Sequence, residues 1–444
     1  MATPAPAPTN KEKYFPQVLA ALVASGGALV AGTVLGWSSQ LFDPLVKEGA
    51  YKFNITEFEF GWCGSILNLG AAATCIPISF ICDLIGRKFT MLSLCGPLLL
   101  GWILVTAAVN PIMVMFGRFF LGMGSGGFCV AAPMYTGEMA SKKIRGLLGT
   151  FFQLMITIGI LISNILGAYV KLLVFHLLCL VITTIFTILF IFLPETPAYL
   201  ISKGKDEKAE KNIKTLRGKN FDPKTEIADL KADLEKRKAH PSNECKSLCT
   251  KYGLTSLFIG MGLMFYQQVS GINAVIFYAS VIFGASKTSL DMSVCTVIVG
   301  VVQVIATCVS AAVVDKMDSV ADLGWLPLTS LIVFIIMFSF GYGPVPWLMM
   351  GEIFDPSFKS IACGINGTTN WTLAFIVTAV YGPLNKAIGG GPVFWIFSGL
   401  TLSGLAFVFF AVTETKGKSL AEIQEIMKSK KEKAKDAETK DAKK

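Results

Sequence analysis

Uncharged amide side chains stand inside long apolar stretches of this sequence, where polar groups are costly and usually serve a function. An amide offers two N–H donors and a carbonyl acceptor without carrying a charge. It can therefore hold an uncharged polar ligand, or it can join two helices by a hydrogen bond. Both interpretations stay open at this point. The amides concerned are Gln153, Gln267, Gln268, Asn273, Gln303 and Asn370.

Catalytic and metal-binding patterns are absent from the sequence. No nucleophile stands in an arrangement with a base, so we expect that the protein is not an enzyme. Cys245 and Cys249 beside His240 could be drawn as a metal site, but three candidate ligands in a lysine-rich loop make a poor one. We therefore expect no metal and no cofactor.

The composition is that of a helical membrane protein. The chain of 444 residues is 53% hydrophobic and 16% charged, whereas a soluble domain carries about 25% charged residues. Apolar stretches of about 20 residues recur, and each can cross about 30 Å of hydrocarbon. A barrel of short alternating strands is excluded. The lysines of the hydrophilic segments indicate topology in a lipid bilayer rather than binding to nucleic acid.

The predicted fold is all-α and polytopic, with two helix bundles of six and five spans. The predicted divisions are an N-terminal tail (1–15), a six-helix bundle (16–193), a cytoplasmic loop with short amphipathic helices (194–253), a second bundle (254–412) and a lysine-rich tail (413–444). The expected spans are 16–37, 60–82, 89–109, 112–136, 147–169, 172–193, 254–284, 290–315, 325–350, 359–383 and 391–412.

Positive charge predicts the orientation of the first bundle. Lys11 and Lys13 precede the first span and Arg87 follows the second, whereas the loop between the third and fourth spans has neither Lys nor Arg. We therefore expect the N-terminus and the large loop on the cytoplasmic side. The sequence "NIT" at Asn54 then lies outside, where it can be glycosylated.

The second bundle breaks this pattern near residues 318 and 319. One span ends inside at Asp315 and Lys316, and the lead into the next begins at once. The short polar segment between them cannot recross the hydrocarbon without leaving its backbone groups unpaired. If every remaining span crossed in turn, the lysine-rich tail would end outside, against the orientation bias. The sequence therefore predicts that one span is missing.

Seven motifs, taken in this order, resemble the sugar-porter family of the major facilitator superfamily, and within it insect carriers of the facilitated trehalose transporter type. "GMGSGG" in the second motif also matches a dinucleotide fingerprint, but no strand precedes it, so we expect helix packing through small residues. The motifs are "DLIGRK" (83–88), "GRFFLGMGSGG" (117–127), "YTGEMASKKIRG" (135–146), "PETPAYLISKGK" (194–205), "QQVSGINAVIFY" (267–278), "GYGPVPWLMMGEIF" (341–354) and "TETKGKSLAEI" (413–423).

The resemblance implies twelve helices in two halves, built from inverted repeats around a site near the membrane midplane. Against that pattern the ninth helix is missing: Asp315 resembles the inner end of helix eight, and "SVADLGW" (319–325) resembles the outer lead into helix ten. The resemblance also implies that the amides above bind sugar hydroxyls, and that Trp347 and Trp371 contact the pyranose ring.

A charge network at the cytoplasmic end is a further implication of the resemblance. Such a network holds the outward-open state and breaks when the carrier turns inward. Plain anchoring by charge is the alternative. Lys359 stands where the family usually has arginine, which weakens the latch of the second half. The implied members are Asp83, Arg87, Lys88, Arg118, Glu138, Arg145 and Glu195 in the first half, and Asp315, Glu352, Lys359 and Glu414 in the second.

Three functions are consistent with these features. The first is a facilitative plasma-membrane carrier that moves a hexose or trehalose by alternating access, impaired by the missing helix. The second is a transport-inactive short form that regulates a full-length carrier by pairing with it, or that senses sugar without moving it. The expected protein partners are a full-length carrier or a second copy of this chain. The third and weakest is a proton–sugar symporter. Proton-coupled members carry a carboxylate in the first helix, and "ASGGALVAGTVLGWSSQ" (24–40) has none.

Overall fold

The computed structural model describes residues 12–141, 143–218, 220–239, 248–277, 333–338, 341–343, 345–355 and 358–412. Predictions for His240, Cys245, Gln303, Asp315 and Glu414, and for the join at 318 and 319, lie outside these residues. The helices are α1 (Phe15–Gln40), η1 (Asp43–Lys47), α2 (Glu57–Ile85), α3 (Arg87–Thr106), α4 (Pro111–Met139), α5 (Arg145–Tyr169), α6 (Leu172–Ile191), α7 (Pro197–Ser202), α8 (Asp206–Arg217), α9 (Lys224–Ala239), α11 (Lys251–Val269), α12 (Ile272–Phe277), α16 (Val345–Ile353), α17 (Lys359–Ile388) and α18 (Gly390–Ala411).

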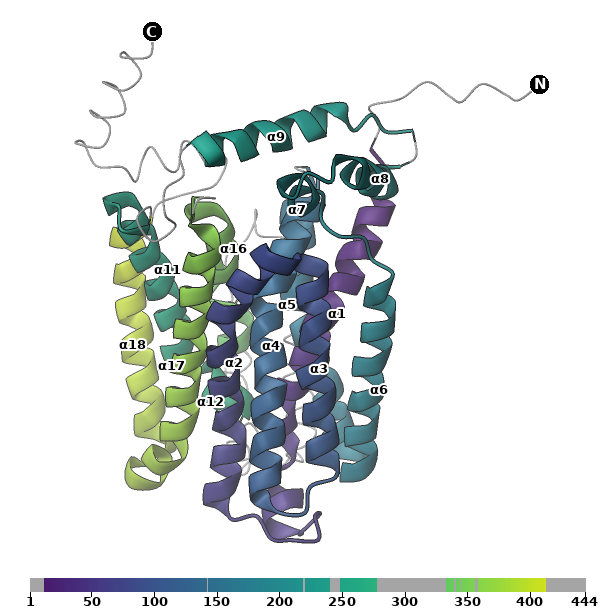
Figure 1. Ribbon diagram of the computed structural model, residues 1–444. Coiled ribbons are helices and arrows are strands. Elements are labelled where there is room, and N and C mark those ends of the chain that lie inside the picture. Colours follow the sequence, from purple (N-terminus) through teal and green to yellow (C-terminus); the bar gives the residue numbers. More distant parts are fainter. Residues whose placement is uncertain are drawn as a thin grey trace.

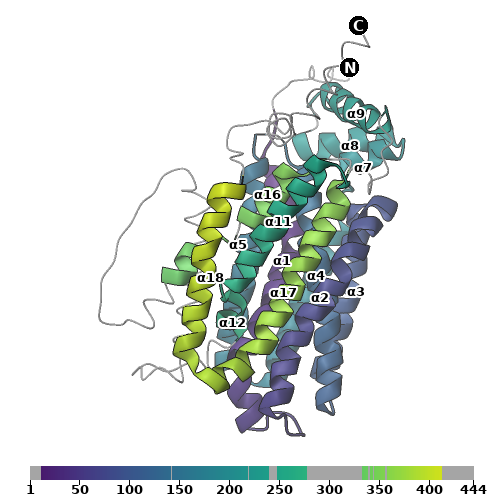
Figure 2. The same ribbon diagram turned by 90° about the vertical axis from the view of Figure 1, so that its left-hand side faces the viewer.

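The predicted all-α, polytopic fold is confirmed. Within the described part of the chain, seven helices are long and apolar enough to cross a membrane: α1 to α6, and Pro392–Ala411 of α18. α1 to α6 run side by side as one bundle, and α11, α16, α17 and α18 stand beside it (Figures 1 and 2). The faces of α6 that point away from the bundle carry exposed apolar side chains such as Leu177, Val181 and Ile185. These faces suit contact with lipid.

Small residues set the helix spacing in the first bundle. A Cβ on Gly122 of α4 would lie 1.9 Å from the Leu67 carbonyl oxygen of α2, and one on Gly126 would lie 2.5 Å from Ala71. Only glycine permits this approach, as in other membrane helix pairs. The "GMGSGG" sequence is therefore a packing surface, as predicted.

The short helices α7, α8 and α9 cover one end of the bundle, which we call the loop end (Figure 1). Buried Leu200, Ile201 and Ala209 pack there against Ile227 and Leu230 of α9, so these helices form a small apolar core of their own. α1 begins at the loop end, because Lys13 N–H donates to the Arg217 carbonyl of α8 at 2.8 Å. The opposite end of the bundle is called the far end below.

Helices α2 and α17 form a long antiparallel seam between the two halves (Figures 1 and 2). Glu57 at the start of α2 forms an ion pair with Lys386 near the end of α17. Further along, Asn68 Nδ2 donates to Thr378 Oγ1 at 3.1 Å. Nearer the loop end, a Cβ on Gly364 would lie 2.9 Å from Ser79 Oγ. The seam therefore keeps the halves in contact along almost the whole of both helices.

Candidate functional site

Four amides lie together where α11, α12 and α17 meet. Asn273 Nδ2 donates to Gln268 Oε1 at 2.5 Å, and Gln268 Nε2 donates to Asn370 Oδ1 at 3.0 Å. Asn370 Nδ2 donates to Gln267 Oε1 at 2.5 Å, and Gln267 Nε2 donates to the Tyr342 carbonyl at 2.5 Å. The side chains are between 2% and 7% exposed. We call this arrangement the amide chain.

The local sequence explains how the amide chain forms. Gly271 separates α11 from α12 with a φ of +84°, a conformation that glycine adopts without strain. The resulting break turns Asn273 back toward Gln268, five residues earlier. A Cβ on Gly271 would also lie 2.5 Å from the Phe397 ring of α18. Gly271 is therefore required both by the backbone conformation and by packing.

Aromatic side chains and a fifth amide border the contact between the halves. Trp347 of α16 is half-buried and packs against the apolar cores of both halves. Its ring centroid lies 6.4 Å from that of Phe152 in α5, next to half-buried Gln153. Trp371 is 5% exposed, follows Asn370 in α17 and reaches the apolar core of the first half. Both predicted indoles thus lie where the two halves meet.

The chemistry available here is neutral hydrogen bonding beside flat apolar surfaces. Each amide of the chain can exchange an amide–amide bond for a bond to a hydroxyl, because a hydroxyl, like an amide, can both donate and accept. Such an exchange is nearly balanced in free energy, since a net hydrogen bond contributes about 1 kcal/mol. Within the described residues, no group of three or more His, Cys, Asp or Glu could hold a metal ion.

A charge network forms at the loop end of the first bundle. Arg87 Nη2 lies 3.1 Å from Asp83 Oδ1 and 2.9 Å from Glu138 Oε1. Glu138 Oε2 accepts a hydrogen bond of 2.7 Å from Thr196 Oγ1. Arg87 also donates to the Cys82 carbonyl, so the guanidinium joins the α2–α3 turn to α4. Three of the predicted latch residues, Asp83, Arg87 and Glu138, therefore meet.

Glu195 closes the same network through backbone groups. Its carboxylate accepts hydrogen bonds from the Lys88 N–H at 3.1 Å and the Thr196 N–H at 2.8 Å. Burial raises the pKa of Glu195 above its usual 4.5, although these two hydrogen bonds act in the opposite direction. Gly86, with a φ of +96°, lets the turn approach, because a Cβ there would lie 2.4 Å from Glu195 Oε2.

The prediction that Arg118 belongs to the cytoplasmic charge network is wrong. Arg118 lies in the second turn of α4, whereas Glu138 lies near its other end. Twenty residues at about 1.5 Å each separate the two by about 30 Å along the helix. Arg118 instead donates to the Cys63 and Val34 carbonyls at 3.1 and 2.7 Å, and to Ser38 Oγ at 3.1 Å. It therefore belongs to the far half of the bundle.

The remaining predicted network residues do not share one contact. Lys88 Nζ donates to the Ile191 carbonyl at the end of α6, where a cation is favourable. Arg145 is exposed at the start of α5 and has no ion pair with a described residue. Lys359 begins α17, and Glu352 lies in α16. The latch of the second half thus stays a prediction.

Two polar contacts escaped the sequence analysis. Trp37 Nε1 donates to His176 Nε2 at 3.0 Å, and the Arg118 guanidinium lies 4.5 Å from the Trp37 ring centroid. Asn68 of the α2–α17 seam was also missed. Polarity within an apolar span was the available signal for Arg118, His176 and Asn68, but the partners depend on helix rotation and tertiary packing.

The helix arrangement is shared with solved transporters of the major facilitator superfamily. The structure titled as the proton:xylose symporter XylE bound to 6-bromo-6-deoxy-D-glucose has a TM-score of 0.77 at 22% identity, covering 94% of this chain and all of that one. A partially occluded, inward-open conformation of the xylose transporter XylE from E. coli has a TM-score of 0.73 at 21% identity. The match covers 90% of this chain and 99% of that one. These likenesses define the class of fold: a polytopic helix bundle of the major facilitator type.

Sequence relatives narrow the class. The family described as "Sugar (and other) transporter" matches residues 20–318 and 320–427. The facilitated trehalose transporter Tret1-2 homolog of Drosophila simulans is 35% identical, over 93% of this chain and 91% of its own length. The facilitated trehalose transporter Tret1 of Polypedilum vanderplanki is 34% identical, over 94% of this chain and 89% of its own length. The chain belongs to the sugar transporter family.

Proposed function

We propose that this chain binds a sugar at the amide chain and that its architecture is that of a facilitative carrier working by alternating access. The observation that carries the proposal is the buried, uncharged chain Asn273–Gln268–Asn370–Gln267 beside Trp347 and Trp371. A neutral polyol requires donors, acceptors and an apolar ring face, and this site offers all of them.

The surroundings of Arg118 support transport without proton coupling. A symporter of this family places a carboxylate on the first helix, where it can take up a proton. Here the acceptors on the first helix are the Val34 carbonyl and the Ser38 hydroxyl, and neither titrates in the physiological range. A substrate gradient then remains as the driving force.

The substrate we propose is trehalose or a hexose such as glucose. The named relatives are facilitated trehalose transporters, which makes trehalose the first sugar to test. Purified chain in vesicles should bind trehalose or glucose but not a charged sugar acid, because the site is neutral. A pH gradient should leave the direction of sugar movement unchanged. Uphill accumulation driven by that gradient would refute facilitation.

The charge network gives the proposed cycle its latch. Arg87, Glu138 and Glu195 connect α2, α3, α4 and α7 at the loop end. An element that must separate from its neighbours to open a pathway has to break contacts of this kind. We assign the loop end to the cytoplasm of a plasma-membrane protein with a cytoplasmic N-terminus. The exposed Asn54 at the far end is then open to glycosylation outside the cell.

A second candidate function rests on the missing helix. The family match is interrupted between residues 318 and 320, which coincides with the break in the charge pattern. The alignment to the D. simulans relative spans 448 positions but covers 93% of 444 residues, or about 413, so about 35 positions have no counterpart here. About 35 residues suffice for one span with its flanks. We therefore propose that the chain transports poorly and can act as a transport-inactive regulator.

Chain direction adds to this argument. Tyr252 at the start of α11 donates to the Ile353 carbonyl at 2.7 Å, whereas Gln267 near the end of α11 bonds Tyr342. α16 therefore runs toward the loop end and α11 away from it. If successive spans alternate in direction, an even number of spans separates α11 from the span that contains α16. The sequence offers one stretch of span length between them, 290–315.

One experiment separates the two candidates. Vesicles containing only this chain are compared with vesicles containing a version into which the ninth helix of a relative has been inserted after residue 318, with trehalose uptake as the readout. We expect uptake to rise at least tenfold on insertion. Equal uptake by both proteins would refute the impairment. In cells, a C-terminal tag accessible only after permeabilisation would show that the tail is cytoplasmic.

A further inference from the structure

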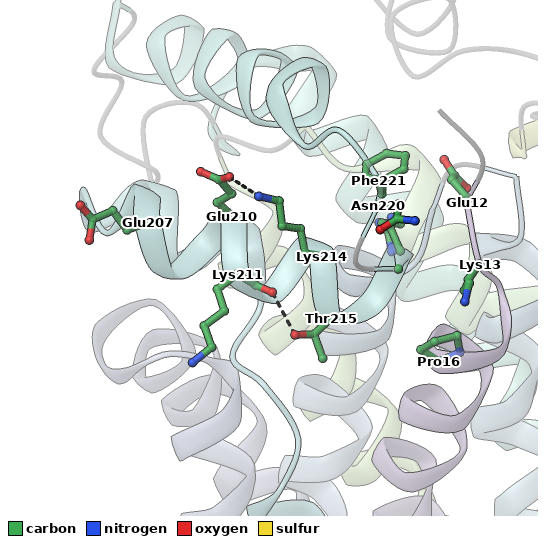
Figure 3. Close-up of a pocket in the computed structure, with 12 residues that line it drawn as sticks. Glu12, Lys13, Pro16, Glu207, Glu210, Lys211, Lys214, Thr215, Asn220 and Phe221 are labelled. Carbon is green, nitrogen blue, oxygen red and sulfur yellow. Dashed lines mark hydrogen bonds and ion pairs between the residues drawn. The ribbon is translucent and has the colours of Figure 1, made fainter. Parts of the chain in front are cut away.

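A groove at the loop end has no part in the sugar site. It lies between one face of α8 and the residues leading into α1, and its volume is about 1180 Å³. Figure 3 shows Glu12, Lys13 and Pro16 at one end of the groove and Glu207 at the other, with Lys211 between. The backbone bond from Lys13 N–H to the Arg217 carbonyl fixes the two walls relative to one another.

Two charged groups at the α1 end of the groove have no ion pair with a described residue. Glu12 Oε2 is buried and accepts no hydrogen bond, although a buried carboxylate oxygen without a donor is costly. Neighbouring Lys13 forms no ion pair with a described residue. By contrast, Glu210 and Lys214 in the middle of the groove neutralise each other at 2.6 Å. Among the described residues, the groups left without an ion pair here are therefore one acid and one base, close together (Figure 3).

Exposed apolar side chains stand at the start of α1, next in sequence to residues that line this end of the groove. Phe15 and Leu19 are 76% and 51% exposed, and both belong to the first turns of a helix long enough to cross the membrane. Pro16 of the same turns lines the groove. Exposed apolar surface on the same helix turns as a polar groove fits a molecule with acyl chains and a polar head.

We propose that the groove holds the headgroup of a zwitterionic aminophospholipid of the phosphatidylethanolamine type. Its ammonium group donates to Glu12 Oε2, and its phosphate accepts from the Lys13 ammonium group. The acyl chains lie along Phe15 and Leu19. One acidic and one basic partner at adjacent positions match a headgroup whose two charges are a few bonds apart, whereas a purely anionic headgroup would leave the Glu12 oxygen without a donor.

The test uses the full chain in lipid nanodiscs of phosphatidylcholine, with or without phosphatidylethanolamine or phosphatidylglycerol. Thermal unfolding is followed, and lipids that co-purify are counted by native mass spectrometry. Phosphatidylethanolamine should raise the unfolding temperature and remain bound, because a ligand of the folded state stabilises it by mass action. The choline headgroup has no N–H donor for Glu12 Oε2, so phosphatidylcholine should not replace it.

Variants localise the effect. Loss of a charge-assisted hydrogen bond weakens binding about tenfold or more, so Glu12→Gln and Lys13→Gln should each lower phosphatidylethanolamine retention by that factor. Lys208→Gln is the matched control, since Lys208 is exposed on α8 and does not line the groove. Equal stability of the unmodified chain in phosphatidylcholine and phosphatidylethanolamine would overturn the proposal without any variant.

Two further outcomes also overturn it. Equal stabilisation by phosphatidylglycerol would mean that an anionic headgroup suffices and that Glu12 receives no ammonium. Equal protection by free phosphoethanolamine at the lipid's effective concentration would mean that the acyl chains contribute nothing.

Discussion

Replacing Gln268 with alanine should weaken sugar binding as well as the fold. Gln268 donates to Asn370 and accepts from Asn273, so the change removes two interhelical hydrogen bonds. Such bonds contribute about 0.6 kcal/mol each in membrane proteins, which gives a loss of about 1.2 kcal/mol in stability. If Gln268 also contacts one or two sugar hydroxyls at about 1 kcal/mol each, the Kd should rise about 5- to 30-fold.

The assay is equilibrium binding of labelled trehalose and glucose to the purified chain, which does not require transport. Asn68→Ala is the matched control, because Asn68 is also a buried amide with an interhelical bond, at 3.1 Å to Thr378, but lies in the α2–α17 seam. It should lower the unfolding temperature by a comparable amount and leave the Kd unchanged. An unchanged Kd in Gln268→Ala, or equal losses of affinity in both variants, would refute the assignment of the amide chain.

Four other changes probe the loop end and the far end. Glu138→Gln should remove the ion pair between Arg87 and residue 138. The rate at which a cysteine introduced near Arg87 is alkylated should then rise at least threefold. Asp83→Asn, on the more exposed side of Arg87, should raise this rate less. Gly86→Ala should destabilise the chain by about 2 kcal/mol or more through a strained φ and contact with Glu195, so an unchanged unfolding temperature would contradict the geometry. The pKa of Glu195 is raised in the folded chain, so the folded state favours the protonated carboxyl group. Glu195 therefore contributes its full stabilisation of the fold below its usual pKa of 4.5, and this contribution is lost as the pH rises through the raised pKa. The difference in unfolding temperature between the unmodified chain and Glu195→Gln should accordingly change with pH. A difference that stays constant with pH would contradict the raised pKa. Arg118→Lys should lower stability at the far end, because lysine lacks the planar donors that reach three acceptors, without creating dependence of sugar uptake on pH.

The spans of the first bundle were predictable because their hydrophobicity is continuous. The charges of the loops also indicate at which end of the bundle a nearby residue lies. The loop before α4 has neither Lys nor Arg, which indicates its side of the membrane, and Arg118 follows it by two turns. The position of this loop therefore predicts that Arg118 and Glu138 lie at opposite ends of α4, whereas the motif resemblance placed both in one cytoplasmic charge network.

The amide chain was predictable only as a set of residues. Asn370 and Gln268 are 102 positions apart, and their meeting depends on the rotation of α17 about its axis and on the break at Gly271. Neither quantity is encoded in hydrophobic periodicity. Helix length was also underestimated, because α17 continues through Pro383 to Ile388 although the apolar pattern weakens there.

The antiparallel α2–α17 seam has a mechanical consequence. Two bodies that touch along one straight line over its full length can rotate about that line without separating, but they cannot slide apart freely. Motion between the halves should then widen one side of the molecule while this edge stays closed. A helix deleted elsewhere in the second half would spare the pivot and disturb the moving edge. Such a protein could assemble, reside in the bilayer and still fail to complete a turnover.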